Sequence, residues 1–451
     1  MSRSQHPFKN RHEAESLRTK ARHFAEAGHS TQAHAFYSRL LASSPVDHEA
    51  LNYLAVHARA EGDVRTACVL LQRAVEAHPS DVVAWRNLGI CLLEAGDVTR
   101  SVAAWDQAIQ LEPSHATSHL QRAHALEREG RHHDAAITYL RAIAEARRTG
   151  MWVSDATTPP GLRPLVQHAV NKVRVANRQL LASLMDPLIA RYGREAMRRV
   201  AAMASNYVGD VKVRPADSRQ RPTFLYFPGL PETPFLPRHL FDWYASLEEA
   251  APSIAAEALD LLQRNARFEP FLGERSEATG TSYLAGRGPQ VPRWDAHFFW
   301  RHGVRYERNC AAAPLTARQL DRLPLGRVPD HGPECLFSVL GPGSEIQPHT
   351  GVTNTRIVTH LPLIVPEHCA LRVAGTVHTW QPGRCVSFDD TFEHEAWNRG
   401  AETRVVLLFD TWNPHLDEAE RDAVARIVVA ISGFNREAWE TPSDGIHSEH
   451  T

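Results

Sequence analysis

The sequence predicts a multidomain α + β protein, with an α-helical repeat array at the N-terminus and a β-rich domain with flanking helices at the C-terminus. Three observations predict this fold class. Glycine recurs every 34 residues across the first third of the chain. A stretch rich in Pro, Gly, Ser and Thr follows at 150–164, as expected of a linker. Short apolar runs separated by Gly, Pro and Asn then dominate, a texture typical of strands and turns.

The composition excludes several classes of protein. Hydrophobic residues make up 43% and charged residues 23% of the 451 residues, unlike a disordered chain, a collagen or a coiled-coil rod. A net charge of −2 predicts no general attraction to nucleic acid or to an anionic membrane. The 26 histidines are unusually many, and their number alone does not say whether any of them binds a metal.

Apolar segments and cysteines indicate the compartment in which the protein is expected. The N-terminus shows no apolar signal segment, and no run approaches the roughly 18–20 apolar residues that span a bilayer. The 6 cysteines form no C-x-x-C pair and are expected to be buried free thiols. We therefore expect a cytoplasmic protein without membrane or nucleic-acid partners.

Three kinds of residue share the 34-residue period in register: glycine (Gly28, Gly62, Gly96, Gly130), proline (Pro45, Pro79, Pro113) and a small residue (Ala33, Ala67, Ser101, Ala135). The period predicts two antiparallel helices in each unit. Glycine allows a left-handed turn after the first helix, and proline closes the second. Stacking of successive units would bury a continuous core that one unit cannot bury alone.

The third unit of the array is the most complete. It carries Trp85, Leu88, Gly89 and Trp105 at spacings that resemble the tetratricopeptide repeat. The small residue Gly89 is expected to let its two helices approach closely. Such arrays usually bind a peptide or protein on their concave face, and a purely architectural role is the alternative. The His132–His133 pair is expected to be solvated surface rather than a metal site.

The remaining segments complete the predicted organisation. A helical pattern returns after the linker, and an amphipathic helix is expected at about 238–264, with a final helix at about 417–431. The expected parts are a repeat array (1–148), a linker (149–164), bridging helices (165–214), the β-rich domain (215–440) and a flexible tail (441–451).

Alternation within the β-rich domain indicates a polar interior. In the segment 355–365, Arg356, Val358 and His360 share one face of the predicted strand, while Ile357 and Leu361 lie on the other. Polar residues on the face of a core strand need partners or a polar cavity, because their burial without partners is costly. This pattern is typical of a barrel or sandwich whose interior holds a ligand.

Two histidines flank this strand in the chain. His349 stands in the motif PHTGVTNTRIVTHLPLIVP, and His394 in FDDTFEHEAWN, which is followed by TRVVLLFDTWNP. These motifs, with the entry segment PTFLYFPGLPETPF, closely resemble the aspartyl/asparaginyl β-hydroxylase family over about residues 219–416. Vertebrate members of that family likewise carry tetratricopeptide repeats ahead of the catalytic domain.

The resemblance implies a double-stranded β-helix, or jelly roll, that uses Fe(II), 2-oxoglutarate and O2. It assigns His349 and His394 as the two iron ligands, a role that suits neutral imidazole. It assigns Arg404 and Ser338 to one carboxylate of 2-oxoglutarate, which a planar guanidinium can bind through two hydrogen bonds. The alternative for Arg404 is a surface salt bridge.

The same resemblance places two further residues in the site. His360 matches a histidine near the other end of the cosubstrate, and Arg356 matches an arginine placed to meet an acidic substrate side chain. The sequence departs from the family at Val358, where the vertebrate relatives carry a second arginine. This departure affects the identity of the substrate more than the use of the cosubstrate.

The third iron ligand is absent from its usual position. Non-haem iron sites commonly combine two His with a carboxylate, and the position two residues after His349 is Gly351. Three alternatives are open: water completes the coordination as in the vertebrate β-hydroxylases, a halide does so as in 2-oxoglutarate halogenases, or the domain is a non-catalytic binder. Asp389 and Asp390 precede His394, but such turn residues are more often caps than ligands.

The sequence therefore predicts a 2-oxoglutarate- and Fe(II)-dependent dioxygenase, similar to a peptide-aspartate β-dioxygenase. It would hydroxylate the β-carbon of Asp- or Asn-type residues in a peptide or protein that the repeat array recruits. The alternatives are an interaction scaffold with a non-catalytic oxygenase-like domain and a 2-oxoglutarate-dependent halogenase.

Overall fold

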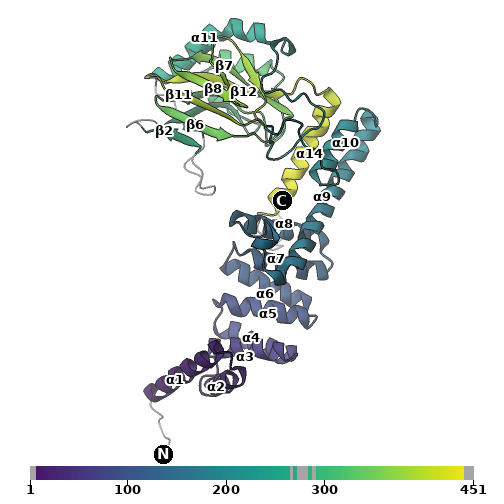
Figure 1. The fold of residues 1–451 in the computed structure, drawn as a ribbon, viewed down its shortest axis with the longest axis vertical. Coiled ribbons are helices and arrows are strands. Elements are labelled where there is room, and N and C mark those ends of the chain that lie inside the picture. The colour runs from purple at the N-terminus through teal and green to yellow at the C-terminus, as the bar shows by residue number, and fades with distance from the viewer. Residues whose placement is uncertain (1–6, 265–267, 272–282, 287–290, 441–451) are drawn as a thin grey trace, which may run out of the picture. The chain divides into compact units, whose positions relative to one another are not determined.

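The computed structural model describes residues 7–264, 268–271, 283–286 and 291–440 (Figure 1). The chain divides into two compact units, one with the residues up to Ala176 and from Gly433 onward, the other with Asn177–Ser432. The tail expected at 441–451 lies outside the described residues.

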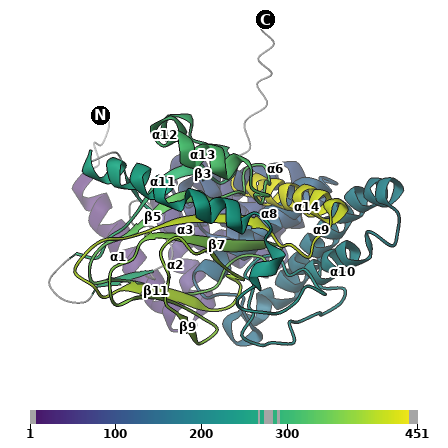
Figure 2. The ribbon, with the colours of Figure 1, turned by 90° about the horizontal axis from the view of Figure 1, so that it is seen from above.

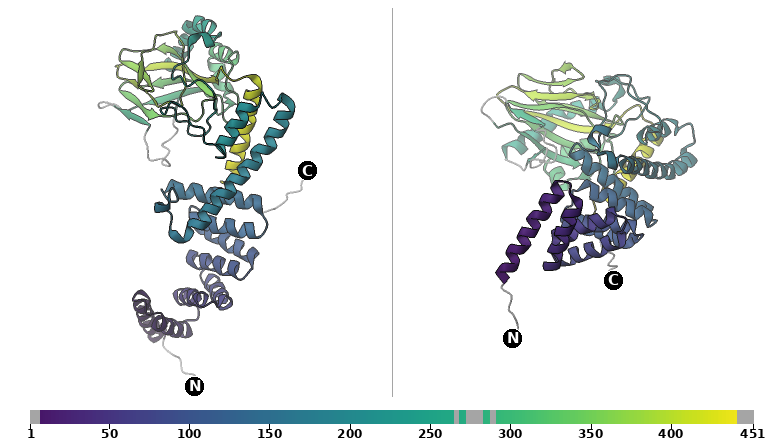
Figure 3. Two further views of the ribbon diagram at one scale, coloured as in Figure 1. Left: turned by 45° about the vertical axis from the view of Figure 1, so that its right-hand side comes forward. Right: turned by 60° about the horizontal axis from the view of Figure 1, so that its bottom comes forward.

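The first unit is a stack of antiparallel helix pairs, which Figure 3 shows side by side. Its array helices are α1 (Pro7–Glu26), α2 (Ser30–Ser43), α3 (His48–Ala60), α4 (Val64–Ala77), α5 (Val82–Glu94), α6 (Val98–Leu111), α7 (Ala116–Arg128) and α8 (His132–Arg148). The turn glycines Gly28, Gly62, Gly96 and Gly130 have φ angles of +76°, +85°, +83° and +85°. The predicted left-handed turns at the 34-residue period are thus confirmed.

Local chemistry fixes where the array helices begin and how closely they pack. Asp63 and Asp97 each cap a helix, accepting a hydrogen bond from the backbone N–H three residues later. A Cβ added at Gly89 would lie 2.7 Å from the indole of Trp105, which packs directly on that backbone. The predicted close approach at Gly89 is therefore confirmed.

The segment after the array is more ordered than a plain linker. It forms two 3₁₀ turns, at Asp155–Thr157 and Pro160–Leu162, and it buries Trp152. Two helices follow, α9 (Arg163–Tyr192) and α10 (Arg198–Tyr207), and the division between the units falls within α9. Within the second unit the later part of α9 packs with α10 and with α14 (Glu418–Glu437) through an apolar cluster.

The strands described in the second unit form two antiparallel sheets, one of seven strands and one of five. The larger sheet has the order β1-β3-β5-β12-β7-β10, with β4 beside β3, and the smaller one has the order β2-β6-β11-β8-β9. The strands are β1 (Glu269–Pro270), β2 (Leu284–Gly286), β3 (Trp294–Arg301), β4 (Val304–Arg305), β5 (Cys335–Leu340), β6 (Ser344–His349), β7 (Arg356–Ile364), β8 (Cys369–Val373), β9 (Thr376–His378), β10 (Val386–Phe388), β11 (His394–Asn398) and β12 (Arg404–Trp412).

The larger sheet has one face toward helices and one toward the smaller sheet. Figure 2 shows α11 (Tyr244–Gln263) lying across the larger sheet, and its side chains share a core with Ile357, Leu361 and Leu407. The helices α12 (Glu307–Ala312) and α13 (Pro314–Asp321) join the same core. On the opposite face, Val358 packs against the cluster that joins the two sheets. The predicted alternation along 356–361 is therefore confirmed.

Three further expectations can be compared with the structure. The helix expected from 238 begins at Tyr244, because 238–240 form a 3₁₀ turn and Phe241, with φ −125° and ψ 87°, is not helical. All the cysteines are free, and all but Cys68 are buried. In the part of the chain that the structure describes, no helix has the length and apolarity to cross a bilayer.

Candidate active site

His349 and His394 face each other across two neighbouring strands. His349 ends β6, His394 begins β11, and the two residues are directly paired in the antiparallel register. Their ring centroids lie 4.1 Å apart. Residues 45 positions apart in the sequence are thus brought together.

A β-bulge gives the two histidines a common face. The register pairs His394 with His349 but Ala396 with Ile346, so β6 has one residue more than β11 between these pairs. In a regular strand Ile346 and His349 would point to opposite faces. The extra residue turns His349 to the face of Ile346 and Ala396, which lies toward the larger sheet. Phe388 packs against His394 from that sheet, with ring centroids 5.5 Å apart.

Hydrogen bonds and burial prepare both rings for metal binding. Nδ1 of His349 lies 2.8 Å from the carbonyl of Gln347, and Nδ1 of His394 lies 3.0 Å from that of Phe392. A carbonyl accepts only, so Nδ1 carries the proton and the Nε2 lone pair is left free. Burial lowers the pKa of His349, and burial followed by the neighbouring His349 lowers the pKa of His394 to about 3. Both rings are therefore neutral, the form that ligates a divalent cation.

The carboxyl group of Asp390 occupies the space above Gly351. The Gly351 N–H donates to the Asp390 carbonyl at 2.6 Å, and a Cβ added at Gly351 would overlap the Asp390 carboxyl group. Burial, and then Asp389, raise the pKa of Asp390 to about 8, while the Arg356 charge acts in the opposite direction. Within the described residues, no third His, Cys, Asp or Glu completes a metal-binding cluster with the two histidines.

The two adjacent aspartates have different surroundings. Asp389 accepts hydrogen bonds from the Thr391 N–H at 2.9 Å and from the Gln220 amide at 2.7 Å, so it organises the turn as expected of a cap. Asp390 has its side chain against Gly351 instead. This difference was not predictable from the residue types, because the contact depends on how the turn before β11 folds over the end of β6.

Arg404 is a buried cation at the other end of the interior. It begins β12 opposite Leu340, is 1% exposed, and has its guanidinium 5.0 Å from the centroid of the Trp380 ring. Its Nη1 donates weakly to the Ser338 hydroxyl at 3.4 Å, while its Nε is buried without a partner. Burial lowers the pKa of Arg404 to about 10. No carboxylate of the described chain pairs with it, which excludes the alternative of a surface salt bridge there.

Two ring nitrogens around Arg404 also lack partners. The ring nitrogens Nε1 of Trp380 and Nδ1 of His360 are buried without a hydrogen bond. Ser338 accepts from the indole N–H of Trp294 at 3.0 Å, which orients its hydroxyl group. Burial, and then Arg404, lower the pKa of His360 well below its usual value, so this ring is neutral. An unpaired buried cation beside unused donors fits an anionic ligand that carries several oxygen acceptors.

Arg356, in contrast, already has an anionic partner. Its Nη1 donates to the Asp410 carboxylate at 2.6 Å and to the His331 carbonyl at 3.1 Å. Arg356 shares the inner face of β7 with His360, as expected, but the sequence did not indicate the ion pair. Its expected contact with an acidic substrate stays a prediction.

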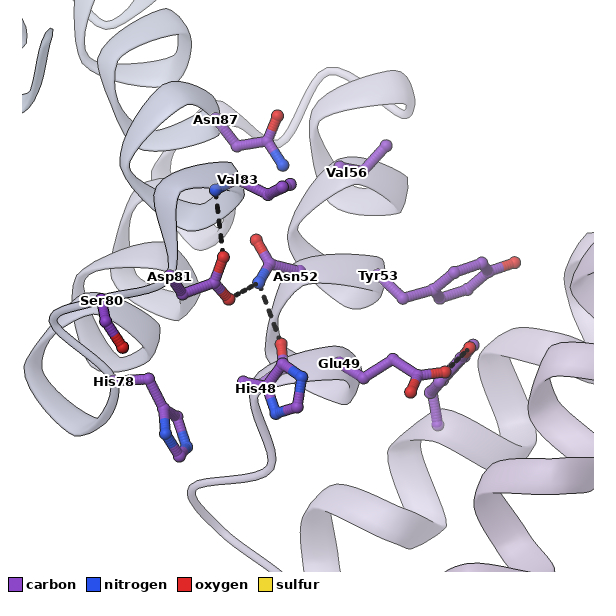
Figure 4. Close-up of a pocket in the computed structure, with 11 residues that line it drawn as sticks. His48, Glu49, Asn52, Tyr53, Val56, His78, Ser80, Asp81, Val83 and Asn87 are labelled. Carbon is purple, nitrogen blue, oxygen red and sulfur yellow. Dashed lines mark hydrogen bonds between the residues drawn. The ribbon is translucent and has the colours of Figure 1, made fainter. Parts of the chain in front are cut away.

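A second candidate site lies in the repeat array. A pocket of about 710 Å³ opens between α3 and the start of α5 (Figure 4). The Asn52 amide spans it, donating to the His48 carbonyl at 3.0 Å and to the Asp81 carboxylate at 2.9 Å. Val56 and Val83 expose 48% and 53% of their surface beside these polar groups.

Comparison with protein-family models gives one match in the β-rich domain and another in the repeat array. The model described as aspartyl/asparaginyl beta-hydroxylase matches residues 248–414. The tetratricopeptide repeat model matches residues 18–81, 65–105 and 92–149.

Curated relatives match the same region. The chain is 36% identical to the human aspartyl/asparaginyl beta-hydroxylase over 135 residues, which cover 30% of this chain and 18% of the relative. It is 30% identical to the human aspartate beta-hydroxylase domain-containing protein 2 over 262 residues, or 55% of this chain and 65% of that protein.

A third relative is named for a lipid substrate. The ornithine lipid ester-linked acyl 2-hydroxylase of Rhizobium tropici is 34% identical over 177 residues, which cover 39% of this chain and 58% of that protein. The chain spans less than two thirds of the length of each of these relatives. Geometry, family models and relatives together show that the chain carries a C-terminal domain of the aspartyl/asparaginyl β-hydroxylase family, preceded by tetratricopeptide repeats.

Proposed function

We propose that the chain is a 2-oxoglutarate- and Fe(II)-dependent dioxygenase that hydroxylates the β-carbon of an Asp- or Asn-type residue in a peptide or protein. The observation that carries this proposal is the buried, unpaired guanidinium of Arg404 in the same interior as two neutral histidines. A buried cation without a counter-ion is unfavourable, so a ligand carboxylate would stabilise this interior.

Each residue has a definite part in the proposed reaction. His349 and His394 would hold the metal through Nε2, and Arg404 with the Ser338 hydroxyl would bind the distal carboxylate of 2-oxoglutarate. His360 would assist at the other end of the cosubstrate. Fe(II), when bound with 2-oxoglutarate, supplies the activation of O2 that converts a substrate C–H bond into C–OH. Residue 351 offers no carboxylate to the metal, and the Asp390 carboxyl group fills the space above it, so water would complete the coordination.

The repeat array favours a protein substrate over a lipid one. The name of the Rhizobium relative points to an acyl chain as another substrate of this domain family. The pocket in the array offers amides, carboxylates and exposed valines side by side, which suits the alternating backbone and side chains of an extended peptide (Figure 4). We infer that the array recruits the protein to be hydroxylated or a partner that delivers it.

Two measurements test the proposed function. The purified chain with Fe(II) should convert 2-oxoglutarate to succinate in the presence of peptides from a lysate, and peptide masses should rise by 16 Da. The His349→Ala variant should lose this turnover, and full turnover in that variant would refute the ligand assignment. Chloride-dependent product masses would indicate a halogenase instead.

A thermal-shift measurement separates the enzyme from a scaffold. Mn(II) with N-oxalylglycine, a non-reactive analogue of 2-oxoglutarate, should stabilise the chain. A scaffold with a non-catalytic domain predicts no such stabilisation, together with peptide capture by the array.

A further inference from the structure

The charge of Arg356 is balanced inside the protein. Asp410, on β12, is 6% exposed and accepts from Arg356 Nη1 at 2.6 Å. The same nitrogen donates to the His331 carbonyl at 3.1 Å, so two acceptors fix its direction. The guanidinium therefore faces the interior as half of an ion pair and not as a free cation.

The Arg356 side chain is closely packed against two glycines. A Cβ added at Gly326 would lie 2.8 Å from Arg356 Cδ, and one added at Gly332 would overlap Nη1. Two glycines thus leave a slot that the arginine side chain fills. The slot and the ion pair together hold the guanidinium in place before any substrate arrives.

A second carboxyl group lies beside this pair. Glu334 directly precedes β5, and its N–H donates to Asp410 at 2.9 Å. Its own carboxyl group accepts from the His302 N–H at 2.7 Å. Two carboxyl groups therefore lie near the guanidinium of Arg356, and Asp410 is the one that pairs with it directly.

Arg356 nevertheless faces the reaction site. Arg356 shares the inner face of β7 with Val358 and His360, and the apolar Val358 lies between Arg356 and His360. Val358 packs against the cluster that contains Ile346 and Ala396, which share a face with the two histidines, so the inner face of β7 is turned toward that pair.

We propose that Asp410 is a positioning residue that sets substrate selection by cancelling the charge of Arg356. The substrate group that meets Arg356 is then an uncharged oxygen acceptor, such as the carboxamide of Asn, in preference to a carboxylate. A substrate carboxylate would be attracted by the guanidinium and repelled by Asp410 at a similar distance, so the two effects would largely cancel. The cost of removing its water shell would then not be compensated. A carboxamide oxygen needs only a donor. This inference rests on the proposed hydroxylase function.

The test uses the full chain with Fe(II), 2-oxoglutarate and a synthetic peptide library. The library carries Asn or Asp in equal amounts at one central position, with randomised flanking residues, and mass spectrometry measures the +16 Da fraction of each. The wild type should favour Asn by about tenfold. Asp410→Asn, which frees the guanidinium, should shift the ratio about tenfold toward Asp, while Asp410→Glu should keep the Asn preference.

Two controls separate an effect on substrate selection from a general loss of folding or of cosubstrate binding. Asp217→Asn removes a carboxylate from an exposed ion pair with Arg219 and should leave the ratio unchanged. Each variant should keep the stabilisation by Mn(II) with N-oxalylglycine, because Asp410 is assigned no contact with the cosubstrate. If Asp410→Asn does not fold, Glu334→Gln carries the test at pH 8, above the Glu334 pKa of about 7, and should shift the ratio about threefold toward Asp.

The results that would overturn the inference are distinct from a failure of the proposed function. A wild type that prefers Asp, or an unchanged ratio in the folded Asp410→Asn or Glu334→Gln variant, overturns it. A chain that Mn(II) with N-oxalylglycine stabilises, but that hydroxylates neither Asn nor Asp peptides, overturns the substrate inference and leaves the oxygenase class standing. The same holds if it hydroxylates an acyl lipid alone. A chain that binds neither probe overturns the proposed function, and the inference with it.

Discussion

Replacing Gly351 with alanine should destabilise the second unit because the new methyl group meets the Asp390 carboxyl group. The backbone of Gly351 is not in the left-handed region, so alanine adds no backbone strain there. The added Cβ would overlap the Asp390 carboxyl group. Overpacking of this kind costs about 1–3 kcal/mol of unfolding free energy. Asp390 is half-buried at the start of the turn before β11, so its side chain can move somewhat and we expect about 2 kcal/mol.

A double-mutant cycle isolates the contact. The variants are Gly351→Ala, Asp390→Ala and their combination, and urea unfolding of the metal-free chain in EDTA measures each unfolding free energy. The combined variant should be about as stable as Asp390→Ala alone, giving a coupling energy of about 2 kcal/mol. Gly433→Ala is the matched control, because nothing lies within 4 Å of the added Cβ in helix α14, and it should be neutral or slightly stabilising.

The contact is refuted if Gly351→Ala is as stable as the wild type, or if Gly351→Ala costs as much stability in the Asp390→Ala background as in the wild type. Either result would mean that the Asp390 carboxyl group does not lie above Gly351 in solution. If the cycle succeeds, Gly351→Asp combined with Asp390→Ala should restore a carboxylate two residues after His349. That variant should bind Mn(II) more tightly than Asp390→Ala alone.

The other predictions concern separate parts of the molecule. Trp380→Phe removes a buried N–H without a partner and should weaken N-oxalylglycine binding in the presence of Mn(II) about tenfold by calorimetry, whereas Trp397→Phe should not. Burial raises the pKa of Glu334 to about 7 from 4.5, so the folded chain keeps a proton that the unfolded chain loses, and stability falls as the pH rises from about 4.5 to 7. Glu334→Gln should reduce that fall by about 2–3 kcal/mol in unfolding at pH 4 and pH 8, and an unchanged slope would contradict the assignment. Gly89→Ala should lower the melting temperature of the helical array, followed by circular dichroism, because its Cβ would lie 2.7 Å from the Trp105 indole.

The repeat array could be predicted almost completely because its determinants are local. Each turn glycine has positive φ, and each helix pair closes within one 34-residue unit. The alternation along β7 was predictable for a similar reason, since neighbouring residues of a strand point to opposite faces regardless of what they pair with. The linker was predicted less well, because the burial of Trp152 depends on the helices against which it packs.

The geometry of the histidine pair was beyond the sequence. A regular β6 would turn His349 away from the face that Ile346 occupies. The bulge that corrects this is defined only against β11, a strand about fifty residues later in the chain. Resemblance to a family could name the two histidines, but only the pairing of β6 with β11 explains why their rings meet.

The two inner arginines show why partners, and not residue types, decide a role. Arg404 and Arg356 are both inward-facing, both begin a strand, and both were expected to bind a carboxylate of a ligand. Arg356 meets Asp410, 54 positions away in the chain, whereas Arg404 meets only a hydroxyl group, a carbonyl and an indole ring among the described residues. An incoming carboxylate therefore removes an unbalanced charge at Arg404 but competes with an existing carboxylate at Arg356. Arginine is thus an anion site at position 404 and a fixed donor for a neutral group at position 356. The difference arises from neighbouring residues that come next to β12 and β7 only when the chain folds.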